Sequence, residues 1–258
     1  MKRRQDASCN ISNICDIDVA NLTQDEALSF IDRLISEKGP HYAAVVNAAK
    51  IVTATRDAAL KRALLEADVV TADGMSVVWA SRLLGHALKQ RVTGIDLFER
   101  LVERAAGRGW SVYFLGASEE SVRRLTERFK KLYPNLEVAG WRNGYFDRSE
   151  SEAVAGEINA SGADLLFVAM GSPAQERWIA SNLASSGVRF AMGVGGSFDH
   201  VSGLARRAPL WMQRNGLEWF YRLMREPRRL WRRYLFGNGA FAWLVVRQRL
   251  LDRKRGIA

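Results

Sequence analysis

The chain has 258 residues, of which 48% are hydrophobic and 26% are charged, and its formal net charge is +10 at pH 7. This composition predicts a packed globular core and excludes a long disordered chain. The two cysteines, Cys9 and Cys15, have no histidine or further cysteine nearby, so they do not indicate a zinc site.

The positive charge is concentrated in the last fifth of the sequence. Residues 206–258 contain 14 Arg and Lys against 3 Asp and Glu, whereas residues 1–205 contain 24 against 25. Four of the eight tryptophans also lie in 206–258. Cations beside aromatic rings suit a membrane interface, and they could also suit nucleic acid, where aromatic rings stack on bases. We therefore divide the chain into a core, 1–205, and a basic, aromatic appendage, 206–258.

No membrane-spanning segment and no signal peptide are expected. The longest apolar run of the appendage, residues 240–246, is far shorter than the roughly 20 residues that span a bilayer. The basic start of the chain is not followed by an apolar segment. The sequence thus predicts a protein that is soluble or bound peripherally to a membrane.

Helices and strands are predicted to alternate from residue 23 onward. Thr23 and Glu26 form a capping box for the first helix, and apolar residues then recur at helical spacing. The predicted helices cover residues 23–37, 55–66, 76–84, 95–107, 118–132, 149–160 and 173–185. The predicted strands cover residues 41–46, 68–71, 111–115, 136–141, 164–170 and 190–194. This order predicts an α/β fold: a Rossmann-like parallel sheet with helices on both faces, followed by a basic helical C-terminal appendage.

Glycines and small polar residues follow the ends of the predicted strands. In a parallel sheet these ends meet at one edge, and ligands bind outside it. Glycine lets backbone amides approach a ligand, and a helix that starts directly afterwards favours an anion. Any single turn could be a simple chain reversal, but together they predict a pocket for a phosphorylated ligand. The turns contain Asn47, Asp73, Gly74, Gly116, Gly171, Ser172, Pro173, Gly195 and Gly196.

Several side chains in these turns could take part in chemistry. Asp73 follows the strand 68–71, where its carboxylate could accept a proton from an attacking hydroxyl or could cap the next helix. Gln175 could hydrogen-bond sugar hydroxyls, and Glu176 could be a first-turn glutamate favoured by the helix dipole. Gly94 and Asp96 repeat this pattern of a tight turn and an acidic first turn.

Three motifs of other ligand sites are rejected. No GxxxxGK[ST] sequence is present, and no GxGxxG follows the first strand, so neither a P-loop enzyme nor a dinucleotide oxidoreductase is favoured. Asp16 and Asp18 form a DxD, which binds a metal–nucleotide complex in many glycosyltransferases. However, it precedes the first helix and alternates like an edge strand. The three histidines do not have ligand spacing, so we expect no metal site.

Seven segments occur in a distinctive order: ADGMSVVWASRLLG, RVTGIDLFERL, VYFLGAS, GWRNGYF, LLFVAMGSPAQERWI, GVGGSFDHVSG and RRAPLWMQRNGLEWFYRLMREPRRLWRRYL. Together, over about residues 15–236, they resemble the WecG/TagA/CpsF glycosyltransferase family. The resemblance implies inverting, metal-independent transfer, without a cofactor, from a UDP-sugar to an undecaprenyl-diphosphate-linked saccharide. Members of the family transfer N-acetylmannosamine, its uronic acid or glucose. It also implies a Rossmann-like core whose appendage helps to close the site and touches the membrane.

The resemblance also assigns roles to individual residues. It makes Asp73 the base and places functional side chains at Gln175, Asp199 and Tyr145. In the appendage it places functional arginines at Arg222, Arg229 and Arg232. One position departs from the family, because Val45 stands where many members have threonine.

These residues suit the proposed reaction physically. Departure of UDP builds negative charge on the diphosphate, which backbone amides and arginines would stabilise. Pro227 is expected to end one helix and begin another, so that some arginines face the active site and others face lipid. We therefore expect a cytoplasmic enzyme of cell-envelope or exopolysaccharide synthesis, peripheral on the inner face of the membrane.

The expected partners are a UDP-sugar, a polyprenyl-diphosphate-linked saccharide and an anionic membrane surface, but not nucleic acid. The sequence does not identify the exact sugars, and it leaves open whether the protein forms a homo-oligomer. It also leaves two rivals: a nucleic-acid-binding module, and another nucleotide-dependent enzyme such as a methyltransferase. Thermal shift with UDP, S-adenosylmethionine and NAD would separate them, since only a true ligand raises the melting temperature.

Overall fold

The core of the protein is a six-stranded parallel sheet. The computed structural model describes residues 10–225 and 227–254. The strand order is β4-β3-β8-β7-β5-β6, and all five pairings are parallel. The strands are β3 (His41–Val46), β4 (Val69–Ala72), β5 (Val112–Gly116), β6 (Val138–Arg142), β7 (Leu165–Ala169) and β8 (Phe190–Gly193). All except the edge strand β6 are buried along their whole length, which explains their nearly continuous apolar sequences.

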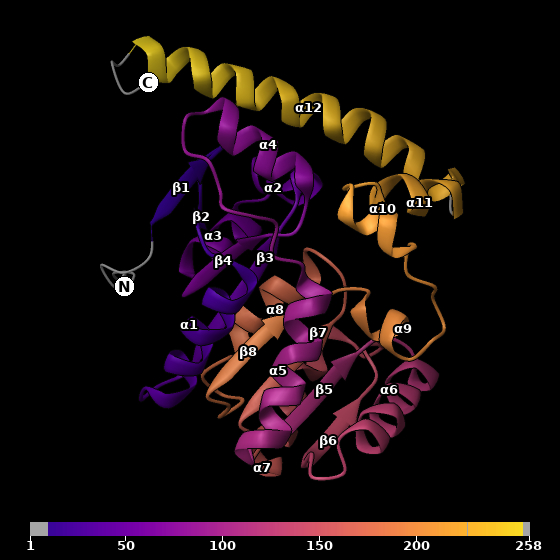
Figure 1. The fold of residues 1–258 in the computed structure, drawn as a ribbon. Helices are drawn as coiled ribbons and strands as arrows, with labels where there is room; N and C mark the ends of the chain where they lie inside the picture. Colours follow the sequence, from indigo (N-terminus) through magenta and orange to yellow (C-terminus); the bar gives the residue numbers. More distant parts are fainter. Residues whose placement is uncertain (1–9, 226, 255–258) are drawn as a thin grey trace.

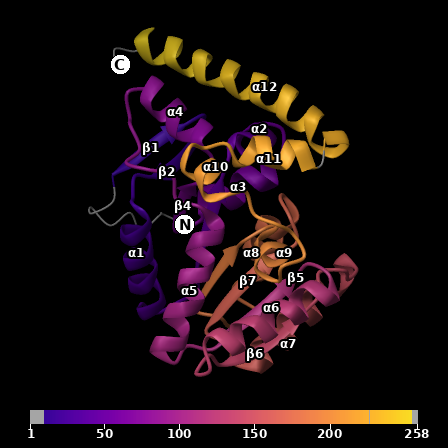
Figure 2. The same ribbon diagram turned by 45° about the vertical axis from the view of Figure 1, so that its right-hand side comes forward.

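Helices cover both faces of this sheet (Figures 1 and 2), which confirms the predicted α/β fold. One apolar cluster joins the sheet to α1, α5, α6 and α9, and the other joins it to α2, α3, α4, α7 and α8. These helices are α1 (Gln24–Ser36), α2 (Ala48–Ala54), α3 (Ala58–Glu66), α4 (Met75–Leu83), α5 (Gly94–Arg108), α6 (Glu119–Leu132), α7 (Ser151–Ser161), α8 (Ala174–Asn182) and α9 (Ser197–Val201). A 3₁₀ turn, Arg148–Glu150, precedes α7.

The prediction was wrong between residues 47 and 57. Instead of one helix from residue 55, the structure has the additional helix α2, and α3 begins after its N-cap Asp57. The two-turn helix α2 was missed because Lys50 interrupts its otherwise apolar buried face, formed by Ala48, Ile51 and Ala54. The remaining predicted helices and strands differ from the structure only at their ends.

A small antiparallel hairpin precedes the first helix. Strand β1 (Ile11–Ile14) pairs with β2 (Ile17–Ala20), and the turn residues Cys15 and Asp16 have φ of 52° and 63°. The strand expected around the DxD is therefore present from Ile17 onward. The Asp16 carboxylate lies 3.0 Å from the Lys61 ammonium, and the Asp18 carboxylate accepts a 2.7 Å hydrogen bond from Asn13. The two acidic side chains thus have separate protein partners.

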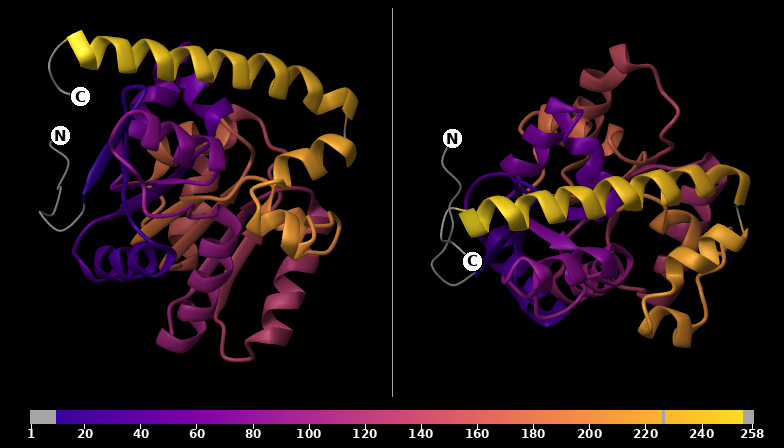
Figure 3. Two further views of the ribbon diagram at one scale, coloured as in Figure 1. Left: turned by 45° about the horizontal axis from the view of Figure 1, so that its top comes forward. Right: turned by 90° about the horizontal axis from the view of Figure 1, so that it is seen from above.

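Three helices form the appendage: α10 (Leu210–Arg214), α11 (Glu218–Arg225) and α12 (Pro227–Lys254). The predicted helix break at Pro227 is confirmed. Helix α12 lies across α2 and α4, as Figure 3 shows. Its Phe241 and Val245 are buried within the core, and its Gln248 side chain bonds to the hairpin at the Cys15 amide (2.7 Å) and the Asn13 carbonyl (3.1 Å). Among the described residues, no helix combines the length and apolar character that a bilayer crossing needs.

Candidate active site

Asn47 and Asp73 stand at the carboxyl ends of two neighbouring strands. Asn47 follows β3 and caps α2, because its Oδ1 accepts a hydrogen bond from the Lys50 amide (3.0 Å). Asp73 follows β4, and its amide donates to the Val46 carbonyl (2.9 Å). A Cβ on Gly74 would lie 3.5 Å from the Asn47 Cβ. Gly74, not Asp73, is the N-cap residue of α4, so the structure does not give Asp73 the capping position.

The turn after β5 needs glycine for two reasons. Gly116 has a φ of 125°, and a Cβ there would lie 2.5 Å from the Ala169 backbone in β7. The next amide, of Ala117, donates to the Ala169 carbonyl (2.8 Å), and the Gly144 amide donates to the Ala117 carbonyl (2.9 Å). The neighbouring Tyr145 is 82% exposed. The predicted Gly116 and Tyr145 segments therefore meet at the same edge of the sheet.

The turns after β7 and β8 are joined by buried side chains. Gly171 (φ 72°) and the cis Ser172–Pro173 bond lead into α8, which begins with Gln175 and Glu176 in its first turn. Gln175 is only 2% exposed, and its Oε1 accepts a hydrogen bond from the Gly195 amide (3.0 Å). Glu176 is equally buried and pairs with Lys50 at 2.7 Å. A bond from Gln175 to a sugar stays a prediction, since its amide here faces protein groups.

The appendage packs against the start of α4, which follows Asp73 in the chain. Gly216, between α10 and α11, has a φ of 70°, and a Cβ there would lie 2.5 Å from the Cγ of Met75, two residues after Asp73. Glu218 accepts hydrogen bonds from Arg91 (2.5 Å) and Arg207 (3.3 Å), and Arg207 also binds Asp96 (2.5 Å). Residues 207–218 therefore lie over the starts of α4 and α5, next to the sheet edge.

The ionised side chains between the appendage and the core stabilise one another. Burial by itself would raise the pKa of Asp96, but hydrogen bonds from Arg207 and Thr93, with the charges of Arg207 and Arg91, lower it below its ordinary value. Burial would lower the pKa of Arg207, but the bond to Asp96 and the charges of Asp96 and Glu218 raise it. Both groups of the pair are therefore charged at neutral pH.

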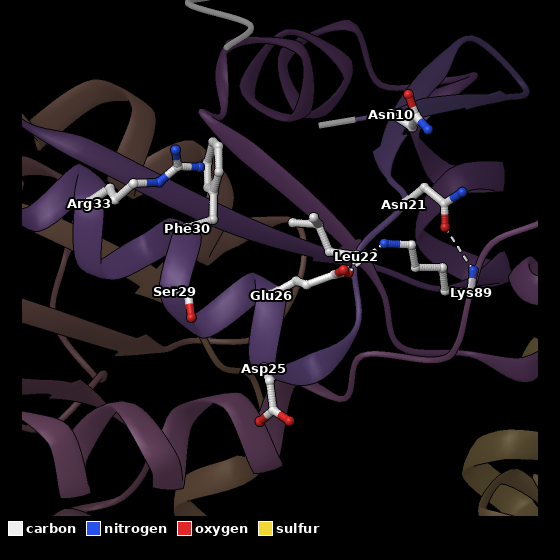
Figure 4. Close-up of a pocket in the computed structure, with 9 residues that line it drawn as sticks. All are labelled: Asn10, Asn21, Leu22, Asp25, Glu26, Ser29, Phe30, Arg33 and Lys89. Atoms are coloured by element: carbon white, nitrogen blue, oxygen red, sulfur yellow. Dashed lines mark hydrogen bonds and ion pairs between the residues drawn. The ribbon is translucent and has the colours of Figure 1, made fainter. Parts of the chain in front are cut away.

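A separate pocket lies at the start of α1 (Figure 4). It has a volume of about 540 Å³ and contains none of the turns at the carboxyl edge. Three of its charged groups form ion pairs: Lys89 binds Glu26 at 2.6 Å, and Asp25 binds Arg100 of α5 at 2.6 Å. We therefore place the candidate active site at the sheet edge and not in this pocket.

A family model described as the glycosyl transferase WecG/TagA/CpsF family matches residues 12–255, which is almost the entire chain. The chain belongs to this family. The family predicted from the seven sequence segments is thereby confirmed, and with it the expectation of a glycosyltransferase.

Two relatives have the same name, N-acetylglucosaminyldiphosphoundecaprenol N-acetyl-beta-D-mannosaminyltransferase. The protein of Bacillus spizizenii is 41% identical over 172 residues, which are 67% of this chain and 66% of the relative. The protein of Bacillus subtilis (strain 168) is 35% identical over 211 residues, which are 80% of this chain and 81% of the relative.

The remaining predicted site residues lie on different parts of the structure. Asp199 of α9 accepts a 2.7 Å hydrogen bond from Ser121 of α6, and Gly196 is the N-cap residue of α9. Gly94 begins α5, and the Val45 methyl groups lie 3.5 and 3.6 Å from where a Gly94 Cβ would be. The predicted arginines lie on α11 and α12, but their side chains are outside the described part of the structure: Arg222, Arg229 and Arg232.

Sequence reasoning missed Lys50, Arg91, Arg207 and Glu218. Lys50 would have stood out as a cation on an apolar helix face, had α2 been recognised. The contacts of Arg91 and Arg207 with Glu218 and Asp96 had no local signal, because most of them join residues more than 100 positions apart. Only the tertiary structure brings these residues close to the candidate site.

Proposed function

We propose that the protein transfers a sugar, with inversion and without a metal or cofactor, from a UDP-sugar to a polyprenyl-diphosphate-linked saccharide. The names of the two relatives support this acceptor class and make N-acetylmannosamine the first sugar to test. Its uronic acid and glucose are the alternatives. The observation that carries the proposal is the place of Asp73, at the end of β4 between the Asn47 turn and the Met75–Gly216 contact.

In this proposal Asp73 is the general base. It accepts the proton of the acceptor hydroxyl, whose oxygen attacks the anomeric carbon of the donor while UDP leaves on the opposite side. A carboxylate at the carboxyl edge of a parallel sheet stands where ligands of this fold class bind. The appendage contact at Met75 would limit the access of water to the reacting groups.

The leaving diphosphate needs groups that stabilise negative charge. We assign this role to backbone amides of the Gly116 and Gly171 turns and to the arginines of the appendage, of which Arg222, Arg229 and Arg232 are the predicted ones. No step of the proposed mechanism uses a metal ion. Transfer at the parent rate in excess EDTA is therefore expected, and a loss that Mg²⁺ or Mn²⁺ restores would contradict it.

The outward face of α12 supports peripheral binding to a membrane. Trp243, Val246 and Leu250 recur at helical spacing and are 60%, 56% and 54% exposed, on the side opposite the buried Phe241. The Arg247 guanidinium lies over the Trp243 ring at 5.5 Å from its centroid. Exposed aromatic and aliphatic side chains beside a cation suit the interface of an anionic bilayer. We infer that this face brings the site to the lipid-linked acceptor on the inner membrane face.

Asp73→Asn tests the proposed reaction. We expect the variant to keep the UDP-dependent rise in melting temperature and to lose about 10²–10⁴-fold in kcat, the usual contribution of a general base. Asp16→Asn is the matched control, because Asp16 lies in the β1–β2 turn. Product mass after incubation with a donor panel and a lipid-diphosphate acceptor would identify the sugar. A parent rate for Asp73→Asn would exclude Asp73 as the base.

A further inference from the structure

An ion pair is buried beneath the sheet edge. The Lys50 ammonium lies 2.7 Å from the Glu176 Oε1, and the two side chains are 8% and 3% exposed. The same ammonium donates to the Val45 carbonyl at the end of β3 (2.6 Å). Two apolar side chains of similar volume often stabilise a core as well as a buried ion pair does. Stability alone therefore does not explain why the site contains two charges.

The ion pair continues into a chain of hydrogen bonds. Glu176 Oε1 also accepts from the Gln175 Nε2 (2.9 Å), and the Gln175 Oε1 accepts from the Gly195 amide (3.0 Å). The chain joins α2, the first turn of α8 and the turn after β8, which follow the three adjacent strands β3, β7 and β8. It thus connects three of the turns from which the proposed site is built.

The charges fix the orientation of the Gln175 amide. An ionised carboxylate only accepts hydrogen bonds and a backbone N–H only donates, so one of the two amide orientations satisfies both neighbours. Lys50 supports this arrangement, because its ammonium donates to the same Glu176 oxygen that accepts from the Gln175 amide. The amide also packs tightly, because a Cβ on Gly193 would lie 2.6 Å from the Gln175 Nε2.

We propose that Lys50 and Glu176 are positioning residues that act through Gln175. The ion pair holds the Gln175 amide, and this amide holds the Gly195 turn in the conformation that the transfer step needs. The inference rests on the proposed function and extends it to residues that do not touch the substrate. If the ion pair had only a structural role, its replacement by apolar side chains would leave kcat unchanged in a folded enzyme.

The decisive variant is Lys50→Met/Glu176→Leu, compared with Gln175→Leu and with the triple variant. An apolar pair of similar volume should preserve the fold, which thermal unfolding checks. We expect the double variant to lose about 10–100-fold in kcat, as for the loss of a hydrogen bond to a charged group, with a smaller change in KM. The triple variant should be no slower than Gln175→Leu, because residues that act through one another are not additive.

Hydrogen exchange of the Gly195 amide gives a readout without turnover. This amide should be protected in the parent and should exchange faster in the double variant. If the parent transfers none of the donors, the proposed function fails, whereas the exchange result still tests the hydrogen-bond chain. If the parent is active and the folded double variant keeps its kcat, or if the effects multiply in the triple variant, the inference is overturned.

Gly193→Ala tests the same idea should the double variant not fold. The added Cβ displaces the Gln175 amide while both charged residues stay in place. Gly193 does not have a positive φ, so alanine fits the backbone there. We expect a loss of kcat similar to that of Gln175→Leu, and Gly107→Ala on α5, with open space around the new methyl group, serves as the control. An unchanged kcat for Gly193→Ala would contradict the positioning role.

Discussion

Glu218→Gln should loosen the appendage from the core. Glu218 is the acceptor shared by Arg91 and Arg207, at 2.5 and 3.3 Å, and all three side chains are less than a quarter exposed. The substitution keeps the shape of the side chain and removes its charge. Arg207 retains Asp96, but Arg91 retains only its longer bond to the Gln213 carbonyl (3.3 Å) among the partners in the described residues. The contact between residues 207–218 and the sheet edge is therefore weakened at one of its two carboxylates.

The expected loss of stability follows from the low exposure of the Arg91, Arg207 and Glu218 side chains. Hydrogen bonds to charged groups contribute about 1.5–3 kcal/mol, and solvent screening is small at this burial. Since glutamine still accepts one bond, we expect a loss of about 1–2 kcal/mol in the free energy of unfolding. In a chain of this size each kcal/mol lowers Tm by about 2–4 °C. Because Gly216 contacts Met75 beside Asp73, kcat/KM should fall together with Tm.

Hydrogen exchange over residues 207–225, thermal unfolding and transfer kinetics would be measured on one preparation. Glu137→Gln is the control, because it makes the same chemical change at an exposed position in front of β6. Exchange should rise in residues 207–225 of Glu218→Gln and stay unchanged in the control. The reasoning would be refuted if Glu218→Gln had the exchange pattern and Tm of the parent.

The remaining predictions concern three other parts of the protein. Gly116→Ala should lower Tm by about 4 °C or more, because its Cβ meets the β7 backbone, whereas Gly107→Ala in α5 should not. Burial raises the pKa of Glu99, so its ionisation on raising the pH above about 4.5 weakens the folded state. Glu99→Gln should accordingly raise Tm at pH 7 and have little effect at pH 4; an equal gain at both pH values would be inconsistent with this sign. Trp243→Ser with Leu250→Ser should reduce sedimentation with anionic liposomes while Tm is unchanged, and undiminished sedimentation would contradict the membrane face.

The sequence predicted the sheet well because its strands are encoded locally. A strand buried on both faces needs a continuous apolar run, and β5, β7 and β8 have one. The runs of β5 and β8 end at glycine, and Gly171 follows that of β7. The edge location of Asp73 followed from the same reasoning, since the ends of parallel strands lie together. These features depend on neighbours in the sequence.

The partners of the site residues could not be predicted in the same way. Nothing beside Gln175 in the sequence indicates that its amide meets Gly195 or that Glu176 meets Lys50, which lies 126 positions away. Glu176 is a first-turn acid of α8, as predicted, but its ion pair with Lys50 had no signal in the sequence around it. The contact of Glu218 with Arg91 likewise depends on how α11 packs, which the local pattern does not specify.

The docking of α12 affects how truncated proteins should be interpreted. Phe241 and Val245 complete the apolar cluster over α2 and α4. Gln248 accepts a hydrogen bond from the β1–β2 hairpin, which lies more than 230 positions earlier in the chain. Removing α12 would expose the apolar surface that it covers on the rest of the enzyme, and this exposed surface would favour self-association. An inactive truncation would therefore not distinguish failed membrane recruitment from a damaged interior, and only point changes on the outward side of α12 can separate the two.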